Sequence, residues 1–223
     1  MKIKQNLNSI KSQLPAQVTL VAVSKTKPVA DLMEAYDAGQ RIFGENKIQE
    51  MTDKWEVMPK DIEWHMIGHV QTNKVKYMAP YVSLIHGVDS LKLLQEINKQ
   101  AAKNNRVIDC LLQVYIAEEE SKFGLDEKEL EEVLKLVQND KENYKNTRIV
   151  GLMGMATFTE NKNQIEKEFK HLKTIFYKLE KLPFTQNLKP NTLSMGMSGD
   201  YQLAISCGST MVRIGSSIFG GRN

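Results

Sequence analysis

The chain has 223 residues, of which 41% are hydrophobic and 26% are charged, and its 30 basic and 27 acidic side chains give a formal net charge of +3. This composition is typical of a globular protein and excludes a disordered, collagen-like or coiled-coil chain. No run reaches the roughly 20 apolar residues of a membrane helix, and the mild charge balance does not indicate a partner such as nucleic acid.

The apolar pattern alternates between helix-like and strand-like segments from the start of the chain. Residues 1–14 predict a helix, because apolar side chains recur near helical spacing until Pro15 ends the pattern. The first 30 residues carry lysines and no acid. This is typical of an amphipathic helix with a solvated face, or of a basic arm that docks on an acidic partner. Residues 18–23 form an almost continuous β-type run, as expected of a strand buried on both faces.

The same alternation continues to the end of the chain. Residues 29–38 predict a helix, with Gly39 as its C′ cap. Ser90 and Asp126 stand at the expected N-caps of two later helices. Further strands are expected to begin near Arg41, Glu63, Ser83, Val107, Arg148, Asn191 and Met211. The remaining helix-like stretches are 47–58, 71–79, 90–104, 126–139, 161–181 and 199–207.

Eight strands separated by helices predict an α/β protein. Eight such units average about 28 residues each, which fits a compact (β/α)8 TIM barrel with an extra N-terminal helix. An open doubly wound sheet is the alternative. No linker rich in Pro, Gly or Ser divides the sequence, so we expect residues 1–223 to form one domain.

In a barrel of this kind, chemistry gathers where strands end. Side chains alternate along a strand, so Val21, Val23 and Lys25 share one face. If the valines point into the barrel, Lys25 follows them at its mouth, where burial lowers an amine's pKa and makes the neutral nucleophile of Schiff-base chemistry available. The alternative is that Lys25 extends into solvent. Lys27 has the same parity but precedes Pro28, which places it in the loop.

Two loops of small residues follow the last two expected strands. One contains Ser198 and the other contains Gly215 and Ser216. Small residues, backbone N–H groups and hydroxyls suit a phosphate, and barrels often bind phosphate in the loops after strands seven and eight. Ordinary tight turns are the alternative. Arg213 has the parity to point from the last strand toward a ligand, or to form a salt bridge within the barrel.

The histidine, methionine and cysteine residues do not predict a further functional site. His65 and His69 lie in a strand-like segment without a third ligand nearby, so no metal site is predicted. Met153 and Met155 have strand parity and are expected in the core. Cys110 and Cys207 lie in apolar segments without metal or redox spacing, which predicts buried thiols in a reducing cytoplasm. The N-terminus has neither the apolar stretch of a secretory signal nor arginine, and this also favours a cytoplasmic protein.

Several short strings together resemble one family, that of the pyridoxal phosphate homeostasis proteins, over nearly the whole chain. The strings occur in the family's order and are AVSKTKP at 22–28, FGEN at 43–46, HMIG at 65–68, QTNK at 71–74, SKFG at 121–124, GLM at 151–153, LSMGMSGD at 193–200 and VRIG at 212–215. The resemblance implies a barrel like the N-terminal domain of alanine racemase, with pyridoxal 5′-phosphate (PLP) bound covalently.

The resemblance also assigns the site residues. It makes Lys25 the Schiff-base lysine, Ser198, Gly215 and Ser216 the phosphate-binding residues, Arg213 the neighbour of the pyridine nitrogen and Asn46 a polar residue near the ring. The sequence departs from the family at Tyr115, where Asn is usual, and at Ser216, where Thr is frequent. Tyr115 has the parity of an inward residue and is expected to alter the cavity rim, whereas Ser216 keeps the hydroxyl.

The resemblance implies storage, buffering or delivery of intracellular PLP, with apo PLP-dependent enzymes as the implied recipients. An arginine beside the pyridine nitrogen disfavours its protonation and weakens the ring as an electron sink. Alanine racemases add a second domain with a catalytic tyrosine, and since this sequence ends at Asn223 we expect no such domain. We therefore expect a monomeric PLP carrier without efficient turnover and without a nucleic-acid or membrane partner.

Two other functions remain open. One is a PLP-dependent amino-acid racemase or related enzyme that uses water or Tyr115 as its acid and base. The other is a barrel enzyme for a phosphorylated metabolite, in which Lys25 forms a Schiff base to a sugar.

Overall fold

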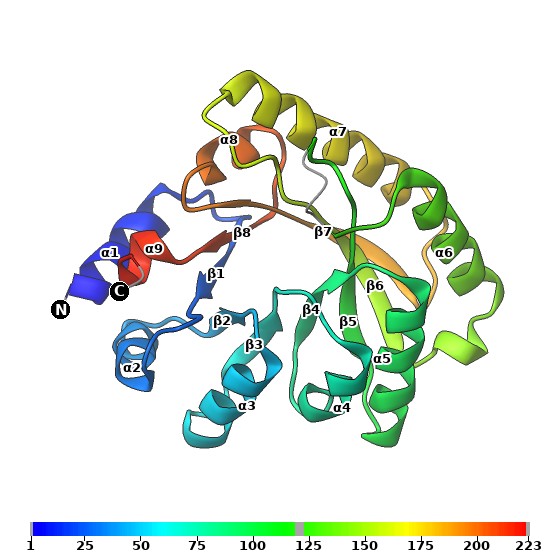
Figure 1. Ribbon diagram of the computed structural model, residues 1–223, viewed down its shortest axis with the longest axis horizontal. Helices are drawn as coiled ribbons and strands as arrows, with labels where there is room; N and C mark the ends of the chain where they lie inside the picture. Colours follow the sequence, from blue (N-terminus) through cyan, green and yellow to red (C-terminus); the bar gives the residue numbers. More distant parts are fainter. Residues whose placement is uncertain (1, 119–122, 222–223) are drawn as a thin grey trace.

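Eight parallel strands close into a barrel in the computed structural model, which describes residues 2–118 and 123–221. Neighbours in the barrel are neighbours in the sequence, and β1 pairs with β8 to complete the ring (Figure 1). The strands are β1 (Thr19–Val23), β2 (Ile42–Glu45), β3 (Glu63–Met66), β4 (Leu84–Val88), β5 (Ile108–Gln113), β6 (Thr147–Met153), β7 (Leu188–Met197) and β8 (Met211–Ile214). The predicted (β/α)8 barrel is therefore confirmed, and the doubly wound alternative is wrong.

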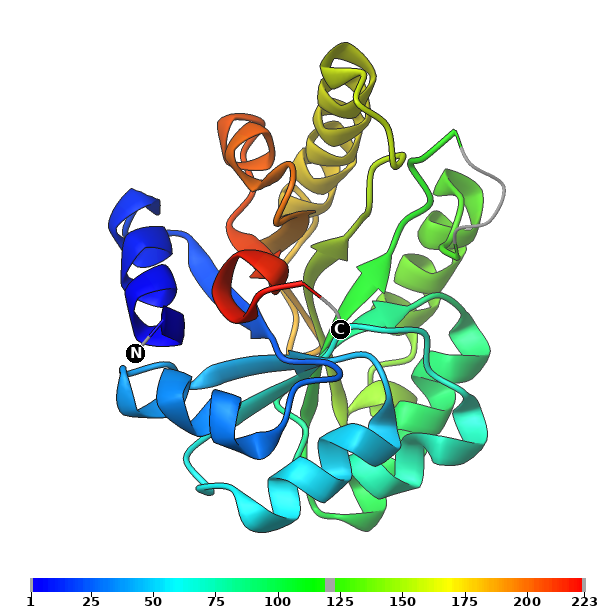
Figure 2. The ribbon, with the colours of Figure 1, turned by 60° about the vertical axis from the view of Figure 1, so that its left-hand side comes forward.

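Helices surround the barrel on its outer side (Figures 1 and 2). They are α1 (Lys2–Gln13), α2 (Val29–Asp37), α3 (Ile48–Val57), α4 (Val75–Met78), α5 (Leu91–Lys103), α6 (Glu127–Asn139), α7 (Lys162–Glu180), α8 (Tyr201–Ser206) and α9 (Ser216–Phe219), with 3₁₀ turns at η1 (Thr72–Lys74) and η2 (Glu142–Tyr144). The predicted caps are in place, because Ser90 Oγ accepts from the Leu93 N–H and Asp126 forms a capping box with Glu129. The short η2 was not predicted.

The apolar side chains form two cores, as the layer structure of a barrel requires. The larger core lies between the outer face of the strands and the helices, and includes Trp64, Phe43 and Phe169, each fully buried. The smaller core fills the barrel interior and includes Val21 and Met153. Side chains that alternate along a strand divide between these two cores, so the strand parity decides which residues reach the cavity at the barrel mouth.

The N-terminal helix α1 packs beside α9, so the first and last helices of the described chain are neighbours (Figure 2). Leu7 and Ile10 of α1 are buried in the outer core, and the Asn6 side chain donates a hydrogen bond to the Ile218 carbonyl at 3.0 Å. The remaining residues of α1 lie mostly at the surface. The amphipathic interpretation of residues 1–14 is therefore confirmed.

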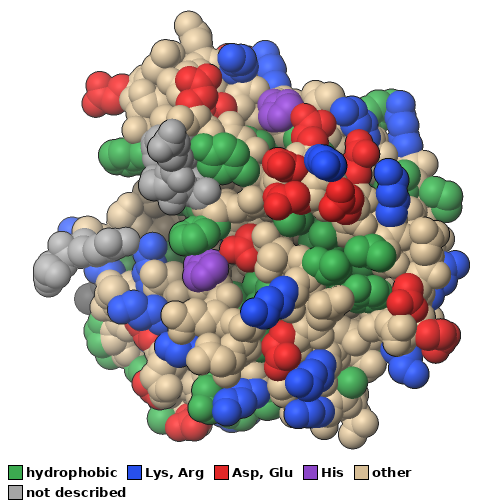
Figure 3. All heavy atoms as spheres, turned by 45° about the vertical axis from the view of Figure 1, so that its right-hand side comes forward, with side chains coloured by type: hydrophobic (Ala, Val, Ile, Leu, Met, Phe, Trp, Pro, Cys, Tyr) green, Lys and Arg blue, Asp and Glu red, His purple; other side chains and the backbone are tan. Residues whose placement is uncertain are grey.

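The surface of the described chain carries both signs of charge. Figure 3 shows lysine and arginine side chains interspersed with aspartate and glutamate over one face. Within residues 2–118 and 123–221, no helix combines the length and the apolar character that crossing a membrane demands.

Candidate functional site

A cavity of about 620 Å³ opens at the carboxyl ends of the strands. Its wall combines the end of β1, the loops after β2 and β3, and the segments that follow β7 and β8. The six predicted site residues all line it: Lys25, Asn46, Ser198, Arg213, Gly215 and Ser216. Barrel closure therefore brings together residues that lie at opposite ends of the sequence.

Lys25 reaches the cavity through the alternation of β1. Val21 packs in the barrel interior, while Val23 and Lys25 line the cavity. The Lys25 side chain is half-buried there rather than extended into bulk solvent. Lys27 lies in the following loop, as predicted, and its Nζ donates to the Gly221 carbonyl at 2.7 Å. Lys27 also lines the cavity, so two amines border the same space.

The two small-residue loops contact each other across the cavity. The Gly215 N–H donates to Ser198 Oγ at 3.2 Å. Because Ser198 Oγ accepts in this bond, its own proton remains available to an anion in the cavity. The Met197 N–H donates to Asp200 Oδ1 at 2.6 Å, which fixes the turn that carries Ser198. Ser216 is exposed and places a second hydroxyl on the same wall.

Arg213 is a buried cation in the wall of this cavity. It is 4% exposed, and its guanidinium donates to the Ser194 carbonyl at 2.9 Å, to Ser194 Oγ at 2.5 Å and to the Gly154 carbonyl at 3.1 Å. These partners are two carbonyls and a hydroxyl, not the carboxylate of a barrel salt bridge. Burial lowers the pKa of Arg213 to about 10, so the side chain stays charged at neutral pH.

A chain of buried polar groups continues from Arg213 into the barrel interior. Ser194 Oγ lies 3.0 Å from His86 Nδ1, and His86 Nε2 lies 3.1 Å from His65 Nδ1. Arg213, Ser194, His86 and His65 therefore form one continuous hydrogen-bonded chain. Burial lowers the pKa of His65 to about 3 and that of His86 well below its usual value, which keeps both rings neutral.

Asn46 follows β2 and is held by close backbone packing. A Cβ atom added at Gly68 would lie 2.5 Å from the Asn46 carbonyl oxygen, so only glycine allows the β3 loop to approach here. Asn46 Oδ1 is buried and has no hydrogen-bond partner among the described residues. An unpaired buried oxygen in a cavity wall is typical of a group that a ligand completes.

Comparison with known proteins is consistent with this geometry. A family model described as "Alanine racemase, N-terminal domain" matches residues 1–223. The pyridoxal phosphate homeostasis protein of Haemophilus influenzae is 37% identical over 236 residues, which cover 100% of this chain and 97% of that protein. The protein of the same name from Escherichia coli K12 is 39% identical over 94% of this chain and 88% of its own length.

The chain belongs to the pyridoxal phosphate homeostasis protein family. Among solved structures, PipY of Synechococcus elongatus with PLP bound superposes with a TM-score of 0.87 at 34% identity, covering 98% of this chain and 100% of that one. Alanine racemase from E. faecalis has a TM-score of 0.74 at 16% identity, over 99% of this chain and 58% of that one, and so shows a shared barrel fold. The predicted resemblance is confirmed.

Three sequence-based expectations for the cavity wall compare with the structure as follows. Tyr115 was expected at the cavity rim, but the residue of β5 that lines the cavity is Gln113. Met153 is buried in the barrel interior as predicted, whereas Met155 is half-buried and lines the cavity. Of the SKFG string at 121–124, the first two residues lie outside the described residues, and Phe123 lines the cavity.

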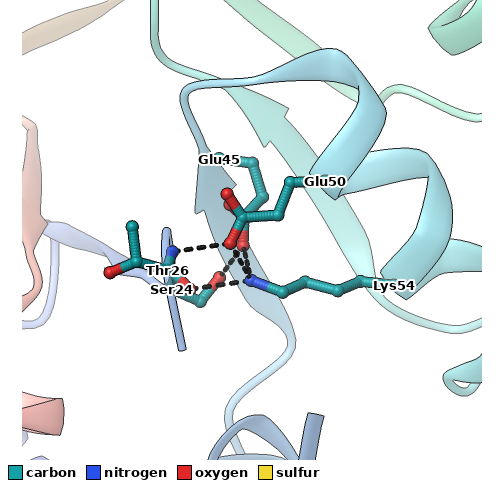
Figure 4. Close-up of polar contacts among 5 residues, drawn as sticks. All are labelled: Ser24, Thr26, Glu45, Glu50 and Lys54. Carbon is teal, nitrogen blue, oxygen red and sulfur yellow. Dashed lines mark hydrogen bonds and ion pairs between the residues drawn. The ribbon is translucent and has the colours of Figure 1, made fainter. Parts of the chain in front are cut away.

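The sequence did not reveal the ion pairs behind Lys25. Lys54 of α3 donates to Glu45 and Glu50 in a cluster that also holds the residues on either side of Lys25 (Figure 4). Lys54 has the sequence position of an ordinary helix lysine, and only the structure shows that it is buried. The one sequence signal for this cluster was that a charged residue, Lys54, lies on the apolar side of the predicted 47–58 helix.

Proposed function

We propose that this chain binds PLP at the barrel mouth, as a Schiff base on Lys25, and acts in intracellular PLP homeostasis as a store, buffer or donor. The observation that carries the proposal is the convergence of the Lys25 amine, one buried cation and two hydroxyl-bearing loops on a single cavity, which Lys27 also lines. PLP needs an amine for its aldehyde and an anion site for its phosphate, and the cavity offers both.

The comparisons support the same ligand. The relatives from H. influenzae and E. coli are named for pyridoxal phosphate homeostasis, and PipY has been solved both with PLP bound and without it. The alignments with these proteins cover 94% to 100% of this chain, so the likeness is not confined to one segment of the barrel.

The residues present fit PLP. Lys25, Lys27 and Arg213 line the cavity against one carboxylate, that of Asp200, so the described wall favours an anion such as a phosphate. The buried Asn46 Oδ1 lacks a protein partner and offers a polar contact beside the ring.

Each residue has a distinct task in this proposal. PLP supplies an aldehyde that a primary amine captures reversibly. Lys25 provides that amine from the end of β1. Ser198 and Ser216 donate hydroxyl protons toward the phosphate, and the glycine at position 215 lets the backbone come close to it. Arg213 would be the neighbour of the pyridine nitrogen, as the family resemblance implies.

Arg213 also favours a carrier function over catalysis with PLP. Its three hydrogen bonds fix the guanidinium, and its pKa of about 10 keeps it charged. A fixed cation next to the pyridine nitrogen opposes protonation of that nitrogen, and the ring then withdraws electrons less well. Weak electron withdrawal suits holding PLP better than turning over amino acids with it.

Absorption spectroscopy with an activity assay tests this proposal. Purified protein titrated with PLP is expected to turn yellow, to saturate at one equivalent, and to racemise or transaminate amino acids far more slowly than ordinary PLP enzymes. Turnover at ordinary enzymatic rates would contradict the carrier role and favour the racemase alternative. A colourless protein would contradict PLP binding and favour a phosphorylated metabolite at the same cavity.

We further propose a cytoplasmic monomer of one domain, residues 1–223, with apo PLP-dependent enzymes as recipients. Cys110 and Cys207 are both buried free thiols, which suits a reducing compartment. The strands that close the barrel come from both ends of the sequence, which supports one domain. Sedimentation velocity should give a single species near 25.4 kDa, and a stable dimer would contradict the monomer.

A further inference from the structure

A buried cluster of charges contacts the residues on either side of Lys25. Lys54 Nζ donates to Glu45 Oε1 at 2.7 Å and to Glu50 Oε1 at 2.8 Å, and it also donates to the Ser24 carbonyl at 2.8 Å (Figure 4). The Lys54 side chain is 7% exposed and that of Glu45 is 0% exposed. We call Glu45, Glu50 and Lys54 the ion cluster.

The ion cluster holds the chain on both sides of Lys25. On one side it binds Ser24 twice, since Ser24 Oγ donates to Glu45 Oε1 at 2.6 Å and the Ser24 carbonyl accepts from Lys54. On the other side Glu50 Oε1 accepts the Thr26 N–H at 2.5 Å. Of the residues joined by these bonds only Thr26 lines the cavity, and it is held through its backbone N–H, so the bonds act on the backbone that carries Lys25.

Thr26 shows why such a support is needed. Its φ of 65° is in the left-handed region, which is unfavourable for a β-branched residue. The Glu50 carboxylate accepts a hydrogen bond from the Thr26 N–H and so stabilises the left-handed conformation of Thr26. The turn at Thr26 then sets the direction in which the chain leaves β1, and with it the direction of the Lys25 side chain.

The same cluster also extends to β2, the strand next to β1 in the barrel. Glu45 is the last residue of β2 and is followed by Asn46, which lines the cavity. Burial raises the pKa of Glu45, and Lys54 acts against that effect as its counter-charge. A buried ion pair generally adds little to stability compared with an apolar pair. Its placement around Lys25 and Asn46 therefore points to a role at the site.

We propose that the ion cluster is a positioning device for Lys25, in which Glu50 and Lys54 hold the Ser24–Thr26 turn so that the Lys25 amine is presented to the ligand's aldehyde. The proposal deepens the proposed PLP function and rests on it. Glu50 and Lys54 are positioning residues, because they contact the backbone beside Lys25 and do not line the cavity.

Glu50→Ala is the primary test, with Glu50→Gln as the conservative variant that keeps an acceptor oxygen for the Thr26 N–H. Glu131→Ala is the matched control, since Glu131 also pairs with a lysine four residues on, in α6 and away from the site. The first readout is the rate constant for capture of PLP, followed by absorbance. The second is reductive methylation of Lys25 relative to the exposed Lys167, measured by mass spectrometry without PLP.

We expect Glu50→Ala to slow PLP capture by about tenfold, because a charge-assisted hydrogen bond is lost. Its Lys25 to Lys167 methylation ratio should also change. Glu50→Gln should stay close to wild type, and Glu131→Ala should match it. A folded Glu50→Ala protein that captures PLP and methylates Lys25 like wild type overturns the proposal, as does an equal effect of Glu131→Ala.

Failure of the proposed function and failure of this proposal can be told apart. If wild-type protein captures no PLP, the proposed function fails, while the methylation ratio in the absence of PLP still decides whether the ion cluster positions Lys25. If Glu50→Ala does not fold, Thr26→Gly/Glu50→Ala replaces it, because glycine adopts a positive φ without steric cost. The methylation ratio of that variant should still differ from that of Thr26→Gly alone, and equal ratios overturn the proposal.

Discussion

At the scale of single residues, the site depends on where each polar atom finds its partner. Ser198 Oγ accepts from Gly215, and Arg213 donates to two carbonyls and a hydroxyl. Asn46 Oδ1 has no partner among the described residues. The first two residues therefore have fixed partners without a ligand, whereas the third has an acceptor oxygen that the described protein leaves unsatisfied.

Replacement of the lysine tests the covalent part of the account. In Lys25→Ala, PLP keeps its phosphate contacts but loses its amine, so binding should become weaker and reversible. After extensive dialysis, wild type should remain yellow and Lys25→Ala should be colourless. Lys27→Ala serves as the control and should keep its colour. An unchanged imine spectrum in Lys25→Ala would assign the attachment to Lys27 or another lysine.

Removal of the Ser198 hydroxyl tests the phosphate end. Ser198→Ala, measured in the Lys25→Ala background, should weaken PLP binding by about 1 kcal/mol, roughly fivefold, since one hydrogen bond is lost. Pyridoxal without the phosphate should bind both proteins equally. Ser217→Ala is a matched control, because Ser217 is exposed and does not line the cavity. Equal losses for PLP and pyridoxal would rule out a phosphate contact.

At the scale of elements, the short strands and their connecting helices determine which side chains reach the cavity. The alternation of β1 alone placed Lys25 correctly, because Val21, Val23 and Lys25 follow one parity. The bounds of the four-residue α9 were not predicted, since such a short segment shows no helical periodicity. Lys54 was missed for a different reason. Besides Glu50 on its own helix, its partners are Glu45 at the end of β2 and the Ser24 carbonyl after β1, and no local pattern reveals a contact made between elements.

The capping box of α6 gives a prediction at this scale. Asp126 Oδ1 accepts the Glu129 N–H at 2.8 Å, and Glu129 Oε2 accepts the Asp126 N–H at 3.0 Å. Asp126→Ala removes one of these bonds and should lower the free energy of unfolding by about 1 kcal/mol. Urea denaturation would measure the change. Glu132→Ala, at an exposed position of the same helix, should have almost no effect, and similar losses in both variants would refute the role of the cap.

At the scale of the whole molecule, closure of the barrel creates the site. Pairing of β1 with β8 brings Lys25 to the same cavity as Arg213 and Ser216. It also encloses the polar chain from Arg213 through Ser194 and His86 to His65. The folding of the barrel and the formation of the site are therefore one event, and conditions that destabilise the interior also affect the cavity.

Acidification tests this link through His65. Its pKa falls from 6.5 in the unfolded chain to about 3 in the barrel, so the unfolded state binds the proton first and stability is lost as the pH falls below about 6.5. Lowering the pH from 7.5 to 5 should reduce the free energy of unfolding by about 2 kcal/mol through protonation of His65 in the unfolded chain. The wild-type free energy of unfolding should therefore fall by that much more than that of His65→Gln. Glu45 titrates in both proteins and cancels in this difference, and parallel pH profiles would contradict the account.

The central claim is that Lys25 holds PLP covalently at the mouth of the barrel. The most direct measurement is borohydride reduction of the protein incubated with PLP, followed by peptide mapping of the reduced adduct. The account predicts one pyridoxyl group, on the peptide that contains Lys25. An adduct on a different lysine, or no adduct in a correctly folded protein, would contradict it.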